Sequence, residues 1–89
     1  MKKQPLNFAI LLYFSRHEEG DADSVIAELA PDYKDYRAFS KKGVVESLMT
    51  AVVNGLLEEV RIGLSDTDEL KVWYKLSESG KRDVKRYLL

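Results

Sequence analysis

The sequence predicts an α+β fold that is mostly α-helical: three helices, a two-stranded β-hairpin and a last helix. Apolar residues recur at helical spacing in three segments before Gly55. They alternate with polar residues in "LLEEVRIGL" (56–64) and "LKVWYKL" (70–76), which flank the polar stretch "SDTDE". Two alternating segments around a short polar loop indicate a hairpin. Ser77 then ends the alternation and can cap a further helix.

Length and composition predict a single domain over residues 1–89. The chain is 45% apolar and 33% charged, a normal globular mixture. It contains no cysteine, so disulfides and thiolate zinc sites are excluded, and we expect a cytoplasmic location. The net charge of −1 gives no overall attraction to nucleic acid. Its distribution is uneven, because residues 16–37 hold three bases and seven acids, a balance of −4.

The first helix is expected over residues 6–16. Phe8, Leu11 and Leu12 share one face at helical spacing, whereas Ile10 and Phe14 lie on another. A helix that is apolar nearly all round is central to a core, or it offers a second side to a dimer partner. The apolar run is too short to span a bilayer, which takes about 20 residues. No small-residue cleavage site follows it, so we expect neither a membrane span nor a signal peptide.

The second helix is expected after the polar break "HEEGDAD", with Asp21 or Asp23 as its cap. It should run to about Ala30, because Pro31 lacks the amide hydrogen that a helix interior needs. Residues 31–39 are then expected to form a loop.

The third helix is expected from Lys41 to about Asn54, with Ser40 as its cap. Four apolar residues follow the i, i+3, i+4, i+7 rule and predict its buried side: Val45, Leu48, Met49 and Val52. Asn54 and Gly55 form a strong helix stop, since both residues tolerate a left-handed C-terminal cap.

The hairpin is expected to place its apolar and polar residues on opposite faces. On the first strand Val60, Ile62 and Leu64 share one face. On the second strand Lys71, Trp73 and Lys75 face outward. The last helix is expected from Glu78 to Leu89, with Val84, Tyr87 and Leu88 available for packing. Gly80, in its first turn, would allow a neighbouring element to approach closely.

Two motifs carry a resemblance to a known family. "VVNGLLEEV" (52–60) resembles the exit from the recognition helix into the first wing strand of bacterial winged helix-turn-helix regulators. "VWYKLSESGKRDV" (72–84) resembles the "YYRLTEKG" signature that closes the wing in PadR-like repressors, with related forms in the MarR-like group. The resemblance covers about residues 7–88. It implies a winged helix-turn-helix fold in which the third helix binds DNA.

The resemblance directs attention to polar residues on the third helix and on the hairpin. A helix in the major groove needs short polar side chains for base edges and cations for phosphates. Lys41 and Lys42 are then candidates for phosphate contacts. The remaining DNA-binding candidates are Ser47, Thr50 and Asn54 on the helix and Arg61, Lys71 and Lys75 on the strands. The alternative is that these residues form an ordinary solvated surface.

Three acids, Asp66, Asp68 and Glu69, lie in the expected hairpin turn. They would be repelled by the negative minor groove, so the turn is expected to stay clear of DNA. The same acids favour an alternative function as a protein–protein interaction module or accessory subunit. Trp73 is expected either to pack against the core or to anchor a partner.

The sequence offers little for catalysis. Its one histidine, His17, lies at a helix end beside several acids, where it is either solvated or part of a metal site with those carboxylates. No nucleophile has a recognisable base, and no glycine-rich phosphate loop occurs. We therefore expect no enzyme and no cofactor. The predicted function is a DNA-binding transcriptional repressor that acts as a homodimer on double-stranded DNA; the sequence does not identify an effector.

Overall fold

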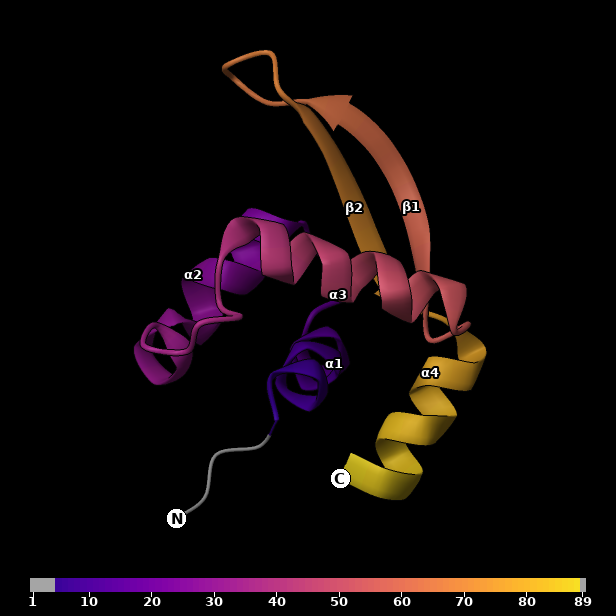
Figure 1. Ribbon diagram of the computed structural model, residues 1–89. Coiled ribbons are helices and arrows are strands. Elements are labelled where there is room, and N and C mark those ends of the chain that lie inside the picture. Colours follow the sequence, from indigo (N-terminus) through magenta and orange to yellow (C-terminus); the bar gives the residue numbers. More distant parts are fainter. Residues whose placement is uncertain (1–4, 89) are drawn as a thin grey trace.

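The computed structural model describes residues 5–88; the expected end of the last helix at Leu89 lies outside these residues. The elements follow in the predicted order (Figure 1). They are α1 (Leu6–Arg16), α2 (Ala22–Tyr33), α3 (Lys41–Val53), β1 (Leu57–Leu64), β2 (Leu70–Leu76), α4 (Glu78–Asp83) and a π-helical turn, η1 (Val84–Leu88). The hairpin projects from one side of the helical body and α4 from the other. No described helix has both the length and the apolarity needed to cross a membrane.

Helix α1 lies at the centre of the core, as its nearly continuous apolar surface predicts. Ile10, Tyr13 and Phe14 are buried, whereas Phe8 remains exposed. The other elements pack around this helix and close one hydrophobic core. Its members outside α1 are Val25, Leu29, Tyr33, Val44, Leu48, Leu57, Tyr74, Leu76 and Val84.

Helix α2 does not end at Pro31, so that prediction is wrong. It continues to Tyr33 with Pro31 inside its last turn. The Lys34 amide donates to the Ala30 carbonyl at 3.0 Å and closes the turn over the proline. Pro31 has no amide hydrogen to donate to the Ala27 carbonyl and its ring crowds that carbonyl, yet the helix continues for two residues beyond it. The extension buries Tyr33.

Helix α3 begins and ends where predicted. Ser40 Oγ accepts a hydrogen bond from the Gly43 amide at 3.0 Å, and Gly55 has a φ of +80° after the Asn54 cap. The predicted buried side is correct only in part: Leu48 is buried and Val52 packs half-buried against the core, but Met49 does not. Val44 and Leu48 are fully buried, whereas Met49 is exposed and Val45 is half-buried. Val44 and Leu48 belong to the hydrophobic core, whereas Val45 borders a hollow that it shares with Leu70 and Val72 of β2.

Strands β1 and β2 form the predicted antiparallel hairpin around residues 65–69. The register shifts between Glu59 and Arg61, which makes Val60 the extra residue of a β-bulge. We call one side of the hairpin its inner face. It carries Leu57, Glu59, Ile62, Leu64, Leu70, Val72, Tyr74 and Leu76. The predicted alternation of Val60 with Ile62 and Leu64 is therefore interrupted, because Glu59 takes the inner position opposite Tyr74. The outer face carries Glu58, Arg61, Gly63, Lys71, Trp73 and Lys75.

The root of the hairpin is attached to the helical body at two places. Gly20, between α1 and α2, forms an antiparallel bridge with Tyr74, with N···O distances of 3.0 and 2.8 Å. The bridge places Glu19 and Asp21 along the outer face of β2. At the other attachment Gly80 packs on the Leu56 carbonyl so closely that a Cβ would lie 2.0 Å from its oxygen. The predicted close approach at Gly80 is therefore confirmed.

The last helix begins as predicted, since Ser77 Oγ accepts from the Gly80 amide at 2.9 Å. It does not remain a regular α-helix to its end. After Asp83 it widens into η1, in which Val84 is buried and Leu88 half-buried. Tyr87 is exposed, so of the three residues expected to pack, it alone faces solvent.

Candidate nucleic-acid interface

The start of α3 carries the two lysines that were predicted to contact phosphates. Both are exposed, but their surroundings differ. Lys42 has no ion-pair partner among residues 5–88. Lys41 Nζ lies 3.0 Å from Asp23 Oδ1 at the start of α2. Within the described part of the chain, Lys42 is therefore the lysine at this helix end whose charge is uncompensated.

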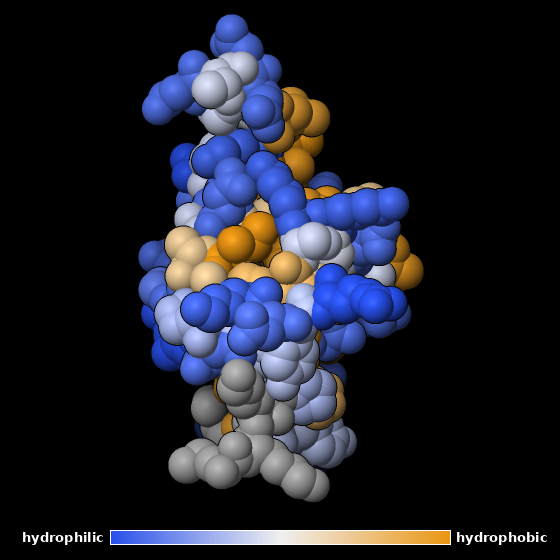
Figure 2. Space-filling view, turned by 60° about the vertical axis from the view of Figure 1, so that its left-hand side comes forward, coloured by the Kyte–Doolittle hydropathy of each residue, from blue (hydrophilic) through white to orange (hydrophobic). Residues whose placement is uncertain are grey.

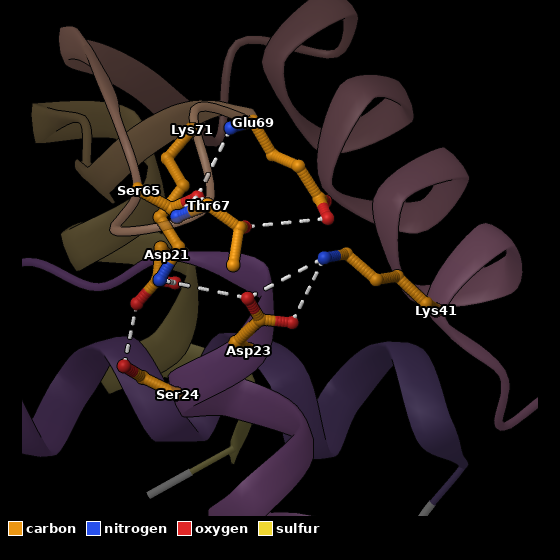
Figure 3. Close-up of polar contacts among 8 residues, drawn as sticks. All are labelled: Asp21, Asp23, Ser24, Lys41, Ser65, Thr67, Glu69 and Lys71. Atoms are coloured by element: carbon orange, nitrogen blue, oxygen red, sulfur yellow. Dashed lines mark hydrogen bonds and ion pairs between the residues drawn. The ribbon is translucent and has the colours of Figure 1, made fainter.

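Asp21 and Asp23 connect the start of α3 to the hairpin (Figure 3). Lys71 of β2 lies 3.2 Å from Asp21 and 3.5 Å from Asp23, measured between Nζ and the nearer carboxylate oxygen. Lys41 and Lys71 thus reach Asp23 from two different elements. Asp21 occupies the predicted cap position of α2, but it makes no side-chain capping bond. Instead it accepts a hydrogen bond from Ser24 Oγ at 2.5 Å.

The buried carboxylate is held in its charged form. Burial raises the pKa of Asp21, but the Ser24 hydrogen bond and the Lys71 ammonium more than offset it, so its pKa lies below the ordinary value. The hydrogen bond to Asp21 also raises the pKa of Lys71. Both groups are therefore ionised over the physiological range, and the pair is a fixed part of the hairpin's attachment.

The predicted base-reading residues border a groove on another side of α3. Ser47, Thr50 and Asn54 line a depression of about 430 Å³ together with Asn7, Ile10 and Leu11 of α1. Ser47 is half-buried there, whereas Thr50 and Asn54 are exposed. The most outward part of α3 instead carries Lys42, Glu46, Met49 and Val53.

The predicted strand cations lie on the outer face as expected, but each has a partner. Arg61 pairs with Glu19 at 2.8 Å and stacks on Trp73, with its guanidinium 4.4 Å from the ring centroid. Lys75 lies 3.8 Å from Glu58. Trp73 is half-buried beneath Arg61 rather than in the core. On the outer face each predicted cation is therefore already paired with an acidic side chain.

The inner face beyond the core is apolar and open to solvent. Leu70 is 71% exposed, and Ile62 and Leu64 beside it on β1 are also exposed. Leu70 and Val72 share a small hollow with Val45 of α3. Met49 and Val53, which is 85% exposed, continue this apolar surface along the helix. Figure 2 shows apolar surface directly below the polar turn of the hairpin.

The eight predicted residues do not form one patch. Lys41 and Lys71 meet around Asp23, and Lys42 is exposed beside them at the start of α3. Three polar residues border the α1 groove, and Arg61 and Lys75 lie on the outer face. Sequence reasoning missed the acids that pair with the cations and the exposure of Met49 and Val53. A run of acids at 18–23 was the one available signal for the ion pairs.

His17 lies at the end of α1 in a local ion-pair cluster. Its Nε2 lies 2.7 Å from Glu28 Oε1, and its ring stacks on Tyr13 with centroids 4.3 Å apart. The hydrogen bond from Arg16 lowers the pKa of Glu28, and His17 adds to this effect. Within residues 5–88 no group of three or more His, Cys, Asp or Glu side chains could hold a metal ion.

Solved structures share this arrangement of elements. PadR from Bacillus subtilis in complex with operator DNA matches 97% of this chain and 48% of its own, with a TM-score of 0.77 and 20% identity. A PadR-like transcriptional regulator from Bacillus cereus strain ATCC 14579 matches 91% of this chain and 75% of its own, with a TM-score of 0.69 and 16% identity. The chain thus spans about half the length of the PadR chain.

The likeness establishes the winged-helix fold, and the predicted resemblance to PadR-like regulators is confirmed at that level. No protein-family model matches the sequence. No curated protein matches it either.

Proposed function

We propose that this chain is a DNA-binding winged-helix domain of a transcriptional regulator, with α3 as the helix that enters the major groove. The observation that carries the proposal is the likeness over 97% of the chain to a PadR structure bound to operator DNA. The hairpin takes the place of the wing beside α3. Lys42 supplies a free cation at the start of the helix, where helix amides also favour an anion.

In this mode phosphate contacts supply most of the affinity and a few base contacts supply sequence choice. Thr50 and Asn54 are the exposed hydroxyl and amide groups of α3 that can turn to base edges. Two copies would place their α3 helices in successive major grooves, about 34 Å apart, and repress transcription by steric exclusion. Phe8 and Tyr87 are exposed aromatic residues on the helical body that suit the contact between two copies.

The test is a titration of labelled duplex DNA at salt concentrations between about 50 and 200 mM. We expect affinity to fall steeply with salt, and the double variant Lys41→Ala/Lys42→Ala to bind at least tenfold more weakly. Lys85→Ala/Arg86→Ala removes the same charge from η1 and should change the affinity much less. A folded protein that shows no binding at the lowest salt would sink the proposal. Light scattering reports the oligomeric state.

A second candidate function is a protein–protein interaction module, and one observation favours it. The surface that would face DNA exposes Met49, Val53, Ile62 and Leu70, while the nearby turn carries three acids. Large exposed apolar patches mark interaction sites. Under this function Ile62→Ser/Leu70→Ser should abolish association with itself or with a partner while leaving the fold intact. Under the first function the same variant should retain most of its DNA affinity.

A further inference from the structure

Lys41 and Lys71 come from separate elements and converge on one carboxylate. Lys41 Nζ lies 3.0 Å from Asp23 Oδ1, and Lys71 Nζ lies 3.5 Å from Asp23 Oδ2. Both lysines line a hollow of about 290 Å³ between the hairpin turn and the start of α3 (Figure 3). A carboxylate that accepts from two ammonium groups occupies the position that a phosphate group with its two free oxygens would take.

The two aspartates around these lysines have different environments. The side chain of Asp21 is 8% exposed, and it is held by Ser24 as well as by Lys71. That of Asp23 is 46% exposed, and within residues 5–88 it is held only by the two lysines. Exposed ion pairs are weak and readily exchanged, whereas breaking a buried pair is costly. Asp21 therefore fixes Lys71 in place, and Asp23 is the partner that another anion can displace.

The hairpin turn adds further negative charge to the same hollow. Ser65 Oγ accepts hydrogen bonds from the amides of Thr67 and Glu69 at 3.3 and 3.1 Å, which holds the turn in one shape. Asp66 and Glu69 line the hollow with Asp23, so three acids surround two lysines. Asp21, which also pairs with Lys71, brings the acids around the two lysines to four. Loss of Asp23 would therefore halve the excess of negative charge and raise the affinity of the hollow for an anion.

We propose that this hollow is a phosphate-binding site in which Lys41 and Lys71 together bind one phosphate group, and that Asp23 occupies it as an internal competitor. The proposal rests on the proposed function in that it takes a phosphate of the DNA backbone as the ligand. It replaces the expectation that the turn stays clear of DNA, because Asp66 and Glu69 border the hollow. A free phosphate compound has the same chemistry and is a separate arm of the test. Binding of the phosphate displaces Asp23 from both lysines and leaves the Asp21–Lys71 pair intact.

The test compares Asp23→Asn with Asp83→Asn, which makes the same charge change on α4. Duplex affinity is measured by fluorescence anisotropy between about 50 and 200 mM salt. Asp23→Asn should bind about three- to fivefold more tightly than the native chain, with a salt slope steeper by about one. Asp83→Asn should differ from the native chain by less than twofold, and Asp23→Asn/Lys41→Ala should lose the gain. If Asp23→Asn fails to fold, Asp23→Ser carries the test, since serine is also tolerated in a first turn.

Inorganic pyrophosphate is titrated in parallel and followed by NMR shifts of the Lys41 and Lys71 amides. If no variant binds DNA, the proposed function fails, and the pyrophosphate titration alone then tests whether the hollow binds phosphate. Tighter pyrophosphate binding in Asp23→Asn, lost with Lys41→Ala, would support a site for free phosphate compounds. Equal or weaker binding of both ligands by a folded Asp23→Asn variant would overturn the proposal, because Asp23 would then be only a structural partner.

Discussion

The two faces of the hairpin differ in how much of their chemistry is already used within the molecule. On the outer face the cations have acidic partners: Arg61 with Glu19, Lys71 with Asp21 and Lys75 with Glu58. On the inner face Ile62, Leu64 and Leu70 extend past the core and have no cover among the described residues. The positive charges of the outer face, which would suit DNA, are therefore already neutralised by acids of the same chain. The apolar side chains of the inner face, which resemble core residues, are exposed and available to a partner.

The largest effect should come from the root of the inner face. Tyr74 is buried where β2 meets α1, so Tyr74→Ala leaves a large cavity and should lower the free energy of unfolding by about 3–5 kcal/mol. Urea unfolding followed by circular dichroism measures it. A loss below about 1 kcal/mol would show that the hairpin root is not part of the cooperative core.

A smaller effect is expected at the outer face. Asp21→Asn leaves Lys71 without its closest carboxylate and should cost about 1–3 kcal/mol at neutral pH. The folded pKa of Asp21 lies below its unfolded value, so its contribution is present above the unfolded pKa and is lost as pH falls through the folded pKa. Unfolding free energies measured between about pH 2 and 7 should therefore show a shallower acid dependence in Asp21→Asn. If stability falls with decreasing pH equally steeply in Asp21→Asn and the native chain, the proposed contribution of Asp21 is contradicted.

Arg61→Ala should have a still smaller effect on stability. It removes the ion pair with Glu19 and the cation–π contact with Trp73, both at a partly exposed site, and should cost about 0.5–1 kcal/mol. Trp73 is the only tryptophan, so its fluorescence should shift to longer wavelength as the ring loses its cover. Lys75→Ala, whose partner is more distant, is the matched control and should leave the emission unchanged.

The smallest effect should come from the outer part of the inner face. Ile62→Thr keeps a β-branched side chain at an exposed strand position and should change the free energy of unfolding by less than about 0.5 kcal/mol. Chemical denaturation measures it alongside Tyr74→Ala. A cost near that of Tyr74→Ala would mean that Ile62 is covered in solution, for example by a second copy, and light scattering would then report the association.

Local signals in the sequence predicted most of the fold. The caps at Ser40 and Ser77, the stop at Gly55 and the close contact at Gly80 each depend on a few neighbouring residues. They fixed the order and the limits of nearly every element. Pro31 is the exception, because its missing hydrogen bond does not end the helix, which continues to Tyr33.

The candidate site was less predictable, because it depends on contacts between distant parts of the chain. Helix α3 carries two overlapping apolar stripes, one through Val44 and one through Val45, and only its packing in the folded core decides that the Val44 stripe is buried. The pairing of Asp23 with Lys41 and Lys71 likewise joins three elements. The sequence shows which residues are cationic, but only the folded structure shows which of them are already paired with acids.

The bridge between Gly20 and Tyr74 has a mechanical consequence. It joins the lower part of β2 to the segment between α1 and α2, so the hairpin cannot pivot from its base. Bending is then expected beyond Tyr74 and its partner Glu59, in the part of the hairpin that ends at the turn, which shortens the moving lever. The amides of Gly20 and Tyr74 should therefore exchange with solvent far more slowly than those of the turn. A shorter lever also loses less motional freedom when a ligand holds its tip.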